Sequence, residues 1–361
     1  MTSGREIEII SIPFVAGIAA GALAVAAFPP AGLYPLVSLS MLLAIGSAAV
    51  LLRRRDLLTM ALLFVSTGLF CALSSHIGDG GGSEGPMQGA ALWLRRLVDS
   101  IPFPHEDTSA LVKALTTGDR NSLDKGLVST FRKAGAAHIL ALSGMHLGIV
   151  YGMLAWLLKP LGNSTLARKI RYALIISACA LYSLATGAGP SIVRAFIFIF
   201  LWETARITGR KASPMKVWCG GLVIQLAVMP SVITSAGFQL SYLAMAGILI
   251  LFPALKEWYP SEGESRLSAR LNLPRRIWEA AALAISCQVF TAPLSCALFG
   301  TFPKYFLLTN LLAMPLSGLL MGLSAVTMAL SAAGICPHIL ILADDAVCQS
   351  LINVLEIIAG I

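Results

Sequence analysis

Polar side chains that can form hydrogen bonds or transfer protons lie inside a strongly apolar run at residues 131–150, FRKAGAAHILALSGMHLGIV. His138, Ser143 and His146 lie where lipid favours leucine and valine, and polar groups at that depth are costly unless they face a partner or a water-filled path. Hydrogen bonding between helices and lining of a hydrophilic path both suit these residue types. On one continuous helix, the side chains of Arg132, Ser143 and His146 would project within about 60° of one another. His138 would then lie within about 140° of all three.

Three further polar residues lie in or beside apolar segments. Arg194 stands about four residues into the apolar part of TGAGPSIVRAFIFIFLW, where a cation must pair, reach outward or bind a ligand. Gln239 begins an apolar segment, and Asn310 lies between Pro293 and Pro315, which interrupt consecutive apolar segments. Broken helices at membrane depth are tolerated mainly where they face protein or a cavity. These residues therefore predict a polar interior.

The composition sets the class of protein that must position these residues. Hydrophobic residues make up 57% and charged residues 12% of the chain, whereas a soluble domain carries about 25% charged residues. The mean hydropathy is +0.81. Apolar runs of about 20 residues, each long enough to cross a hydrocarbon core of ~30 Å, recur along the chain. We therefore predict an all-α polytopic membrane protein with about 10–11 transmembrane helices and an external helical, amphipathic insertion.

The predicted transmembrane segments follow one another along the whole chain. They are 9–28, 33–52, 57–75, 136–158, 171–188, 190–208, 216–231, 237–253, 278–299 and 305–331. A last segment, 338–359, either spans the membrane or lies at its interface, because it contains Asp344, Asp345, Asn353 and Glu356. The predicted organisation is 1–75 for N-terminal transmembrane helices, 76–107 for an external Gly-rich linker and amphipathic helix, 108–331 for the central region, and 332–361 for the C-terminal helix.

The net charge of +8 is explained by orientation in the membrane. With the N-terminus in the cytoplasm, every short predicted inner loop is basic, as the positive-inside rule requires. Gly17 and Gly21 predict a helix-packing surface in the first span. The seven cysteines are scattered, and no Cys/His cluster has the spacing of a zinc site. We therefore expect no metal and no cofactor.

The external stretch 76–135 is predicted to be helical after its flexible Gly-rich beginning. Residues 87–101, MQGAALWLRRLVDSI, form an amphipathic segment suited to the membrane surface or to packing on the helix bundle. A helix is expected around 106–117, followed by a turn. Ser122 is predicted to cap a second helix that runs to about Lys133.

The segment GDRNSLDKGLVSTFRKAGAAHILALSGMHLGIV resembles the signature of the ComEC family of DNA-uptake channels, in the membrane region called the competence domain. The resemblance covers about 108–330. Its matching positions are Gly118, Asp119, Arg120, Phe131, Arg132, Ala134, Gly135, His138, Leu140, Ala141, Ser143, Gly144, His146, Gly148, Pro190, Ser191, Arg194, Ala195, Gly237, Phe238, Gln239, Leu240, Ser241, Pro293, Phe299, Gly300, Asn310 and Pro315.

The resemblance implies a channel that admits one strand of transforming DNA across the inner (cytoplasmic) membrane of a bacterium. A polyanion needs positive potential along its route and wet, neutral walls. The path residues would be Arg120, Phe131, Arg132, His138, Ser143, His146, Arg194, Gln239 and Asn310. Among these, the arginines would supply the potential, the histidines would donate hydrogen bonds to phosphate, and Phe131 would offer a stacking face for a base.

The sequence also departs from the longest members of that family. We expect neither their external OB-like domain nor their metallo-β-lactamase-like domain, since 76–107 is short and no HxHxDH pattern occurs. No catalytic residue is therefore predicted, and the chain is expected not to be an enzyme. The expected partners are a separate nuclease, DNA-binding protein or helicase. Assembly as a homo-oligomer is also compatible with the sequence.

Two alternatives remain open from the residues. Broken helices with polar groups at the midplane also fit a small-solute transporter or a structural membrane partner. An intramembrane serine hydrolase would use Ser143 with a histidine base within about 2.6–3.2 Å of its hydroxyl, and would need an oxyanion site.

Overall fold

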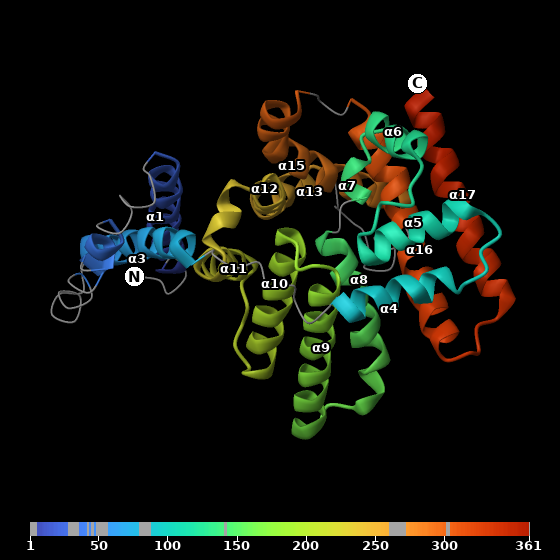
Figure 1. The fold of residues 1–361 in the computed structure, drawn as a ribbon, viewed down its shortest axis with the longest axis horizontal. Helices are drawn as coiled ribbons and strands as arrows, with labels where there is room; N and C mark the ends of the chain where they lie inside the picture. Colours follow the sequence, from blue (N-terminus) through green and yellow to red (C-terminus); the bar gives the residue numbers. More distant parts are fainter. Residues whose placement is uncertain are drawn as a thin grey trace. The chain divides into compact units, whose positions relative to one another are not determined.

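The computed structural model describes residues 6–27, 36–41, 43–44, 47, 57–78, 88–140, 143–259, 272–300 and 304–360. The regular elements within these residues are all helical, which confirms the predicted all-α class (Figure 1). Most of the predicted span 33–52 and most of the Gly-rich linker lie outside the described residues. The chain divides into two compact units: unit 1 is Met1–Glu84 with Ile197–Tyr242, and unit 2 is Gly85–Phe196 with Leu243–Ile361.

Three helical segments of the described chain are long and apolar enough to cross a membrane: Ile10–Ala27, Leu273–Phe299 and Phe306–Ala332. Shorter apolar helices cover Met60–Leu73, Pro214–Val228 and Ala236–Ile250. About 20 apolar residues are needed to span the hydrocarbon core. The ten or eleven predicted spans therefore include several segments that fold as helices but fall short of that length or apolarity. The clearest difference is the predicted span 136–158, which is interrupted before Gly144 and continues as a helix of 14 residues.

In unit 1, α1 (Glu6–Ala27) and α3 (Leu57–Gly78) pack through small residues. A Cβ atom placed on Gly17 would lie 2.0 Å from the Val65 carbonyl oxygen, and one placed on Gly68 would lie 2.2 Å from the Phe14 carbonyl oxygen. The two backbones therefore meet closely. The predicted packing role of the glycine face of the first helix is confirmed.

The rest of unit 1 is built around Tyr242. Unit 1 contains the last part of α10 (Pro190–Ile207), α11 (Pro214–Val228), η2 (Pro230–Thr234) and the first part of α12 (Ala236–Ile250). The Tyr242 hydroxyl donates to Gln225 Oε1 at 3.0 Å, and its carbonyl accepts from Trp218 Nε1 at 3.2 Å. These hydrogen bonds satisfy polar groups that packing has removed from water.

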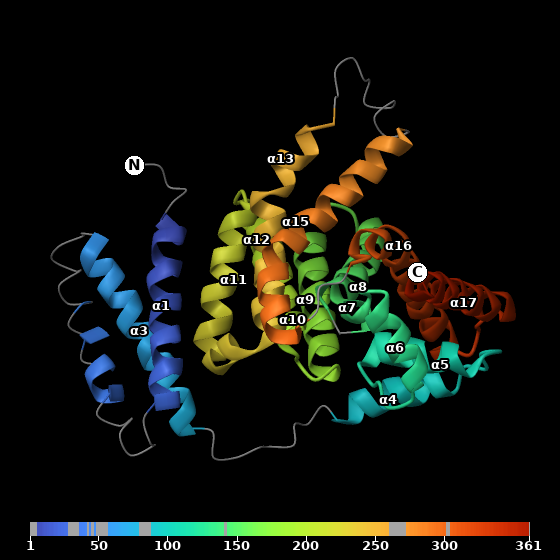
Figure 2. The same cartoon turned by 90° about the horizontal axis from the view of Figure 1, so that it is seen from above.

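Unit 2 contains most of the helices. They are α4 (Gln88–Asp99), α5 (Glu106–Thr117), α6 (Lys125–Lys133), α7 (Ala137–Leu140), α8 (Gly144–Leu157), η1 (Lys159–Leu161), α9 (Thr165–Ala185), the first part of α10, the last part of α12, α13 (Phe252–Glu257), α15 (Leu273–Phe299), α16 (Phe306–Ala332) and α17 (His338–Gly360). In both ribbon views α4, α5 and α6 gather beside α17 (Figures 1 and 2). The predicted helix at 106–117 is confirmed, as is helical structure in the amphipathic segment 87–101.

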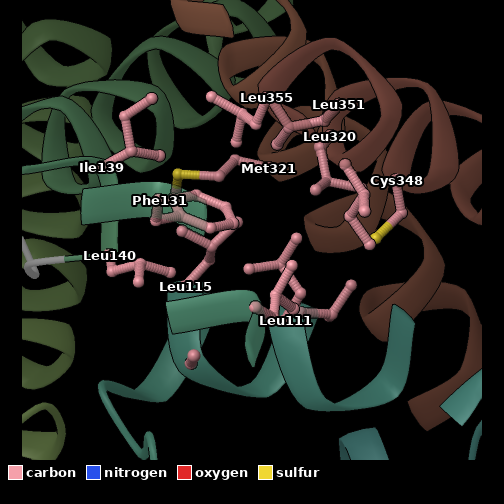
Figure 3. Close-up of a cluster of buried hydrophobic side chains, with 14 of the residues drawn as sticks. Leu111, Leu115, Phe131, Ile139, Leu140, Leu320, Met321, Cys348, Leu351 and Leu355 are labelled. Atoms are coloured by element: carbon pink, nitrogen blue, oxygen red, sulfur yellow. The ribbon is translucent and has the colours of Figure 1, made fainter. Parts of the chain in front are cut away.

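The main core of unit 2 joins the short helices α5 to α7 to α16 and α17. Phe131 has no exposed surface and lies among side chains from all of these elements (Figure 3). Ion pairs tie α4 to the segment that follows it: Lys113 Nζ contacts Asp99 Oδ1, and Arg95 Nε lies 3.3 Å from Asp119 Oδ2. Residues 88–140 are therefore a folded layer joined to the two C-terminal helices.

The N-cap of α6 is Asp124, which corrects the predicted cap at Ser122. The Asp124 carboxylate accepts hydrogen bonds from the backbone nitrogens of Gly126 at 2.6 Å and Leu127 at 3.2 Å. A carboxylate at this position also interacts favourably with the positive end of the helix dipole. Sequence reasoning placed the helix start two residues early, because serine and aspartate are comparable caps.

We expect Asp124→Ala to destabilise the first turn of α6 by about 1 kcal/mol, because two backbone N–H groups lose their acceptor. Hydrogen exchange of the Gly126 and Leu127 amides should accelerate about fivefold, measured by mass spectrometry on the full chain. Ser122→Ala is the matched control and should leave this exchange unchanged. An equal acceleration in both variants would contradict the assignment of Asp124 as the cap.

Candidate functional site

The segment 131–150 is three helical pieces rather than one. α6 ends at Lys133, Gly135 adopts a φ of 75°, the four-residue α7 follows, and α8 begins at Gly144. The common arc predicted for Arg132, His138, Ser143 and His146 required one continuous helix. It therefore does not exist in the structure.

Ser143 and His146 are held to each other at the start of α8. The Ser143 backbone nitrogen donates to His146 Nδ1 at 3.2 Å, and the Ser143 hydroxyl lies 3.1 Å from the same atom. The Met145 backbone nitrogen donates to Ser143 Oγ at 3.3 Å. This is a capping box with histidine in the place usually taken by glutamate or glutamine. The spacing SGMH thus encodes a helix start at the break in the segment.

This capping box determines which nitrogen of His146 carries the proton. Since Nδ1 accepts from the Ser143 N–H, the neutral imidazole is protonated at Nε2. His146 has no exposed surface, and its Nε2 has no hydrogen-bond partner among the described residues. A buried donor without an acceptor is costly and requires an explanation. An acceptor supplied by a ligand is one such explanation.

Arg194 lies against the same helix start. It is 9% exposed and belongs to α10, which begins at Pro190 as predicted. A Cβ atom placed on Gly144 would lie 3.1 Å from Arg194 Nη2 and 3.3 Å from the Ala195 Cβ atom. Gly144 is the first residue of α8, whose N-terminus carries a partial positive charge. A guanidinium and a helix N-terminus side by side form an arrangement that an anion stabilises.

The first turn of α16 joins this region to the turn between α6 and α7. The Thr309 hydroxyl donates to the Ala134 carbonyl, and the Asn310 side chain interacts with the His138 imidazole. His138 Nδ1 lies 3.2 Å from the Gly135 carbonyl oxygen, so it is the protonated nitrogen of that ring. Asn310 Oδ1 is buried and has no hydrogen-bond partner within the described part of the chain. His138 and Asn310, both predicted path residues, are therefore neighbours.

The remaining predicted residues are Arg120, Arg132, Gln239 and Phe131. Arg120 and Arg132 are exposed on unit 2. Gln239 belongs to unit 1, where its Nε2 donates to the Ile233 carbonyl at 2.7 Å. Phe131 requires a correction: its ring fills the core between α5, α16 and α17, so it has no face for a base (Figure 3).

Sequence reasoning missed Thr309 as a contact of the site and gave Asp344 and Asp345 no role beyond lowering the hydropathy of the last segment. A threonine beside an asparagine in an apolar run carries no signal of its own. Asp344 and Asp345 did carry a signal in the sequence, because two adjacent carboxylates in an apolar helix need polar partners.

The geometry of Ser143 does not favour a hydrolase. Its hydroxyl lies within reach of a histidine, but it also accepts the hydrogen bond that caps α8. His146 Nε2 has no orienting carboxylate among the described residues, whereas a catalytic base is held by a third group. No group of three or more potential metal ligands occurs within the described residues. The site is thus best described by its hydrogen-bond donors and its positive charge.

Comparison with known proteins gives a consistent set of relatives. A family model described as "Competence protein" matches residues 115–361. ComE operon protein 3 of Bacillus subtilis (strain 168) is 31% identical over 145 residues, which is 40% of this chain and 18% of that protein. The uncharacterized protein YcaI of Escherichia coli (strain K12) is 26% identical over 219 residues, covering 60% of this chain and 28% of that protein.

A third relative is competence protein ComA of Neisseria gonorrhoeae, 25% identical over 214 residues, which is 58% of this chain and 28% of that protein. The chain therefore matches less than a third of the length of each of these relatives. No solved structure matches the chain.

Proposed function

This chain belongs to the Competence protein family, and from that premise we propose that it forms a path by which DNA, as a single strand, crosses the inner membrane of a bacterium during natural transformation. One of its relatives is named as a competence protein, and another as a protein of the ComE operon. In this proposal the protein moves its substrate without chemical change, and its N-terminus lies in the cytoplasm.

The observation that carries the proposal is the meeting of Arg194 with the N-terminus of α8. A phosphodiester oxygen placed there would accept hydrogen bonds from the guanidinium and interact with the helix dipole. The buried His146 Nε2–H, which has no acceptor among the described residues, supplies a further donor in the same helix turn. Every nucleotide carries a phosphate, so such a contact is independent of base sequence, as passage of arbitrary DNA requires.

The other predicted path residues have secondary roles in this proposal. Arg120 and Arg132, both exposed, attract the polyanion to the protein. His138 and Asn310 offer polar groups beside the first turn of α16. Ser143 acts indirectly, because it holds His146 and caps α8. Gln239, which lies in unit 1, stays a predicted path residue.

The proposed arrangement in the membrane follows the predicted regions. The membrane-embedded part consists of residues 1–75 and 108–331. Residues 76–107 lie outside the membrane, and residues 332–361 form the C-terminal transmembrane or interfacial helix. A separate nuclease, DNA-binding protein or helicase would supply functions that this path lacks, and a homo-oligomer would enlarge it.

A small-anion transporter would use the same positively charged site at Arg194 and the N-terminus of α8. The experiment must therefore distinguish passage of DNA from transport of a small anion. The full chain is reconstituted into lipid vesicles, and passage of fluorescent single-stranded oligonucleotides and of radioactive inorganic phosphate into the lumen is measured. We expect oligonucleotide to reach the lumen, protected from added nuclease, only in vesicles that contain the protein. Equal oligonucleotide signals with and without the protein would refute the proposal, and passage of phosphate alone would establish the transporter.

Within this assay we expect Arg194→Gln to reduce oligonucleotide passage about 10- to 100-fold, because one charge-assisted contact contributes roughly 1.5–3 kcal/mol. Arg194→Lys keeps the charge but loses the planar fork, so it should restore passage only in part. Arg168→Gln removes an exposed cation from α9 and serves as the matched control. Passage in Arg194→Gln equal to that of the control would exclude Arg194 from the path.

A further inference from the structure

A second polar cluster lies between α16 and α17, apart from the residues assigned to the path. Asp344 has no exposed surface, and its Oδ1 accepts a hydrogen bond from the Ser324 hydroxyl at 2.9 Å. The Thr327 hydroxyl, one turn further along α16, also faces this carboxyl group and has no exposed surface. Asp344 Oδ2 and Thr327 Oγ1 are both without a hydrogen-bond partner among the described residues. The cluster thus contains two unsatisfied oxygen atoms where the two helices meet.

No cation within the described residues forms an ion pair with Asp344. α16 carries no charged residue, and the basic residues of α6, which also packs on α17, are exposed. On α17 itself, the neighbouring titratable groups are Asp345 and Cys348. An ionised carboxylate buried in this way would cost several kcal/mol.

The adjacent Asp345 differs, since each of its carboxylate oxygens has a partner at the N-terminal end of α5. Its Oδ2 lies 2.9 Å from His105 Nδ1, and its Oδ1 accepts from the Thr108 hydroxyl at 2.6 Å. Asp107 of α5 adds a further negative charge near Cys348. The one cation of α5, Lys113, is paired with Asp99, and His105 is engaged by Asp345, so neither neutralises Asp344.

We propose that Asp344 is a proton-binding site, held as a neutral carboxylic acid between α16 and α17. One proton neutralises the carboxyl group. Placed on Oδ2, it gives the group a donor for which the Thr327 hydroxyl supplies an acceptor, while Oδ1 keeps its hydrogen bond from Ser324. A hard metal cation takes about six oxygen ligands, and the side chains here supply fewer.

Binding and release of this proton would couple to the packing of α16 on α17. Loss of the proton leaves an uncompensated charge in a helix interface without other ions, so the interface must admit water or separate. Near its N-terminal end, α16 (Phe306–Ala332) also carries Thr309 and Asn310, which contact the turn between α6 and α7. The protonation state of Asp344 therefore affects α16, the helix that also carries the proposed path residue Asn310.

Infrared difference spectroscopy on the full chain in lipid vesicles tests this inference directly, and needs no DNA. We expect a carbonyl band of a protonated carboxylic acid at mildly acidic pH in the wild type and its loss in Asp344→Asn. Asp345→Asn, one residue along, is the matched control and should keep the band. Thr327→Val should keep the band but move it to higher frequency, because the acid loses its acceptor.

Thermal unfolding provides the second measurement. The folded wild type holds a proton that an exposed aspartate in the unfolded chain releases, so its stability should fall as the pH is raised from acidic to neutral. Asp344→Asn mimics the neutral acid, so the stability of this variant should not decrease in this way as the pH is raised. Absence of the band in the wild type, or stability that follows Na⁺ concentration instead of pH, would overturn the proposal.

Discussion

Gly144→Leu is expected to reduce oligonucleotide passage about 10- to 100-fold while the protein remains folded and in the membrane. Even a Cβ atom on this residue would lie 3.1 Å from Arg194 Nη2. A leucine side chain extends further, so it would take the place of the guanidinium and push it away from the N-terminus of α8. The helix cap made by Ser143 would remain, because it uses backbone nitrogens and the His146 ring.

Gly148→Leu is the matched control for this variant. It makes the same chemical change one turn later on α8, where a Cβ atom would meet nothing within 4 Å. Passage should then be close to that of the wild type. If the two variants behave alike, the effect comes from the helix and not from the position of Arg194, and the proposed phosphate contact is wrong.

Gly17→Ala is expected to cause a large loss of stability in unit 1, of about 2–3 kcal/mol. The added Cβ atom would lie 2.0 Å from the Val65 carbonyl oxygen and 2.9 Å from the Leu69 backbone nitrogen. These are backbone atoms of α3, so no side-chain rotation relieves the overlap. The two helices must separate and lose the contacts that hold them together.

Denaturant unfolding in mild detergent measures this loss. Gly322→Ala on α16 is the control, since a Cβ atom there meets nothing within 4 Å, and alanine is the better helix former. This control should be as stable as the wild type or slightly more stable. A Gly17→Ala protein that unfolds at the same denaturant concentration as the wild type would show that α1 and α3 are not packed through this glycine.

Local and periodic features were predictable from the sequence. Apolar composition predicted a helical membrane protein, and Gly17 and Gly21, four residues apart, predicted a packing face because small residues let two backbones approach. Pro190 predicted a helix start, since proline lacks the N–H that a first turn leaves unused. Each of these properties depends on residues within a few positions of one another.

The interruption at Ser143 shows where such reasoning stops. The residues SGMH suit a capping box, yet the apolar residues on both sides continue the pattern of a single long helix. Which of the two occurs depends on the surroundings: Arg194 comes from another helix and lies against Gly144, and Thr309 holds the turn at Ala134 from 175 residues away.

By itself, the sequence determined the class of the protein and most of its helices, because these follow from local composition and spacing. Tertiary structure alone decided which side chains meet. Phe131 lies in the core because α16 and α17 cover it, and Asp344 lost contact with water because α17 packs its acidic pair between α16 and α5. Burial and pairing are properties of contacts between distant segments, and no spacing along one helix specifies them.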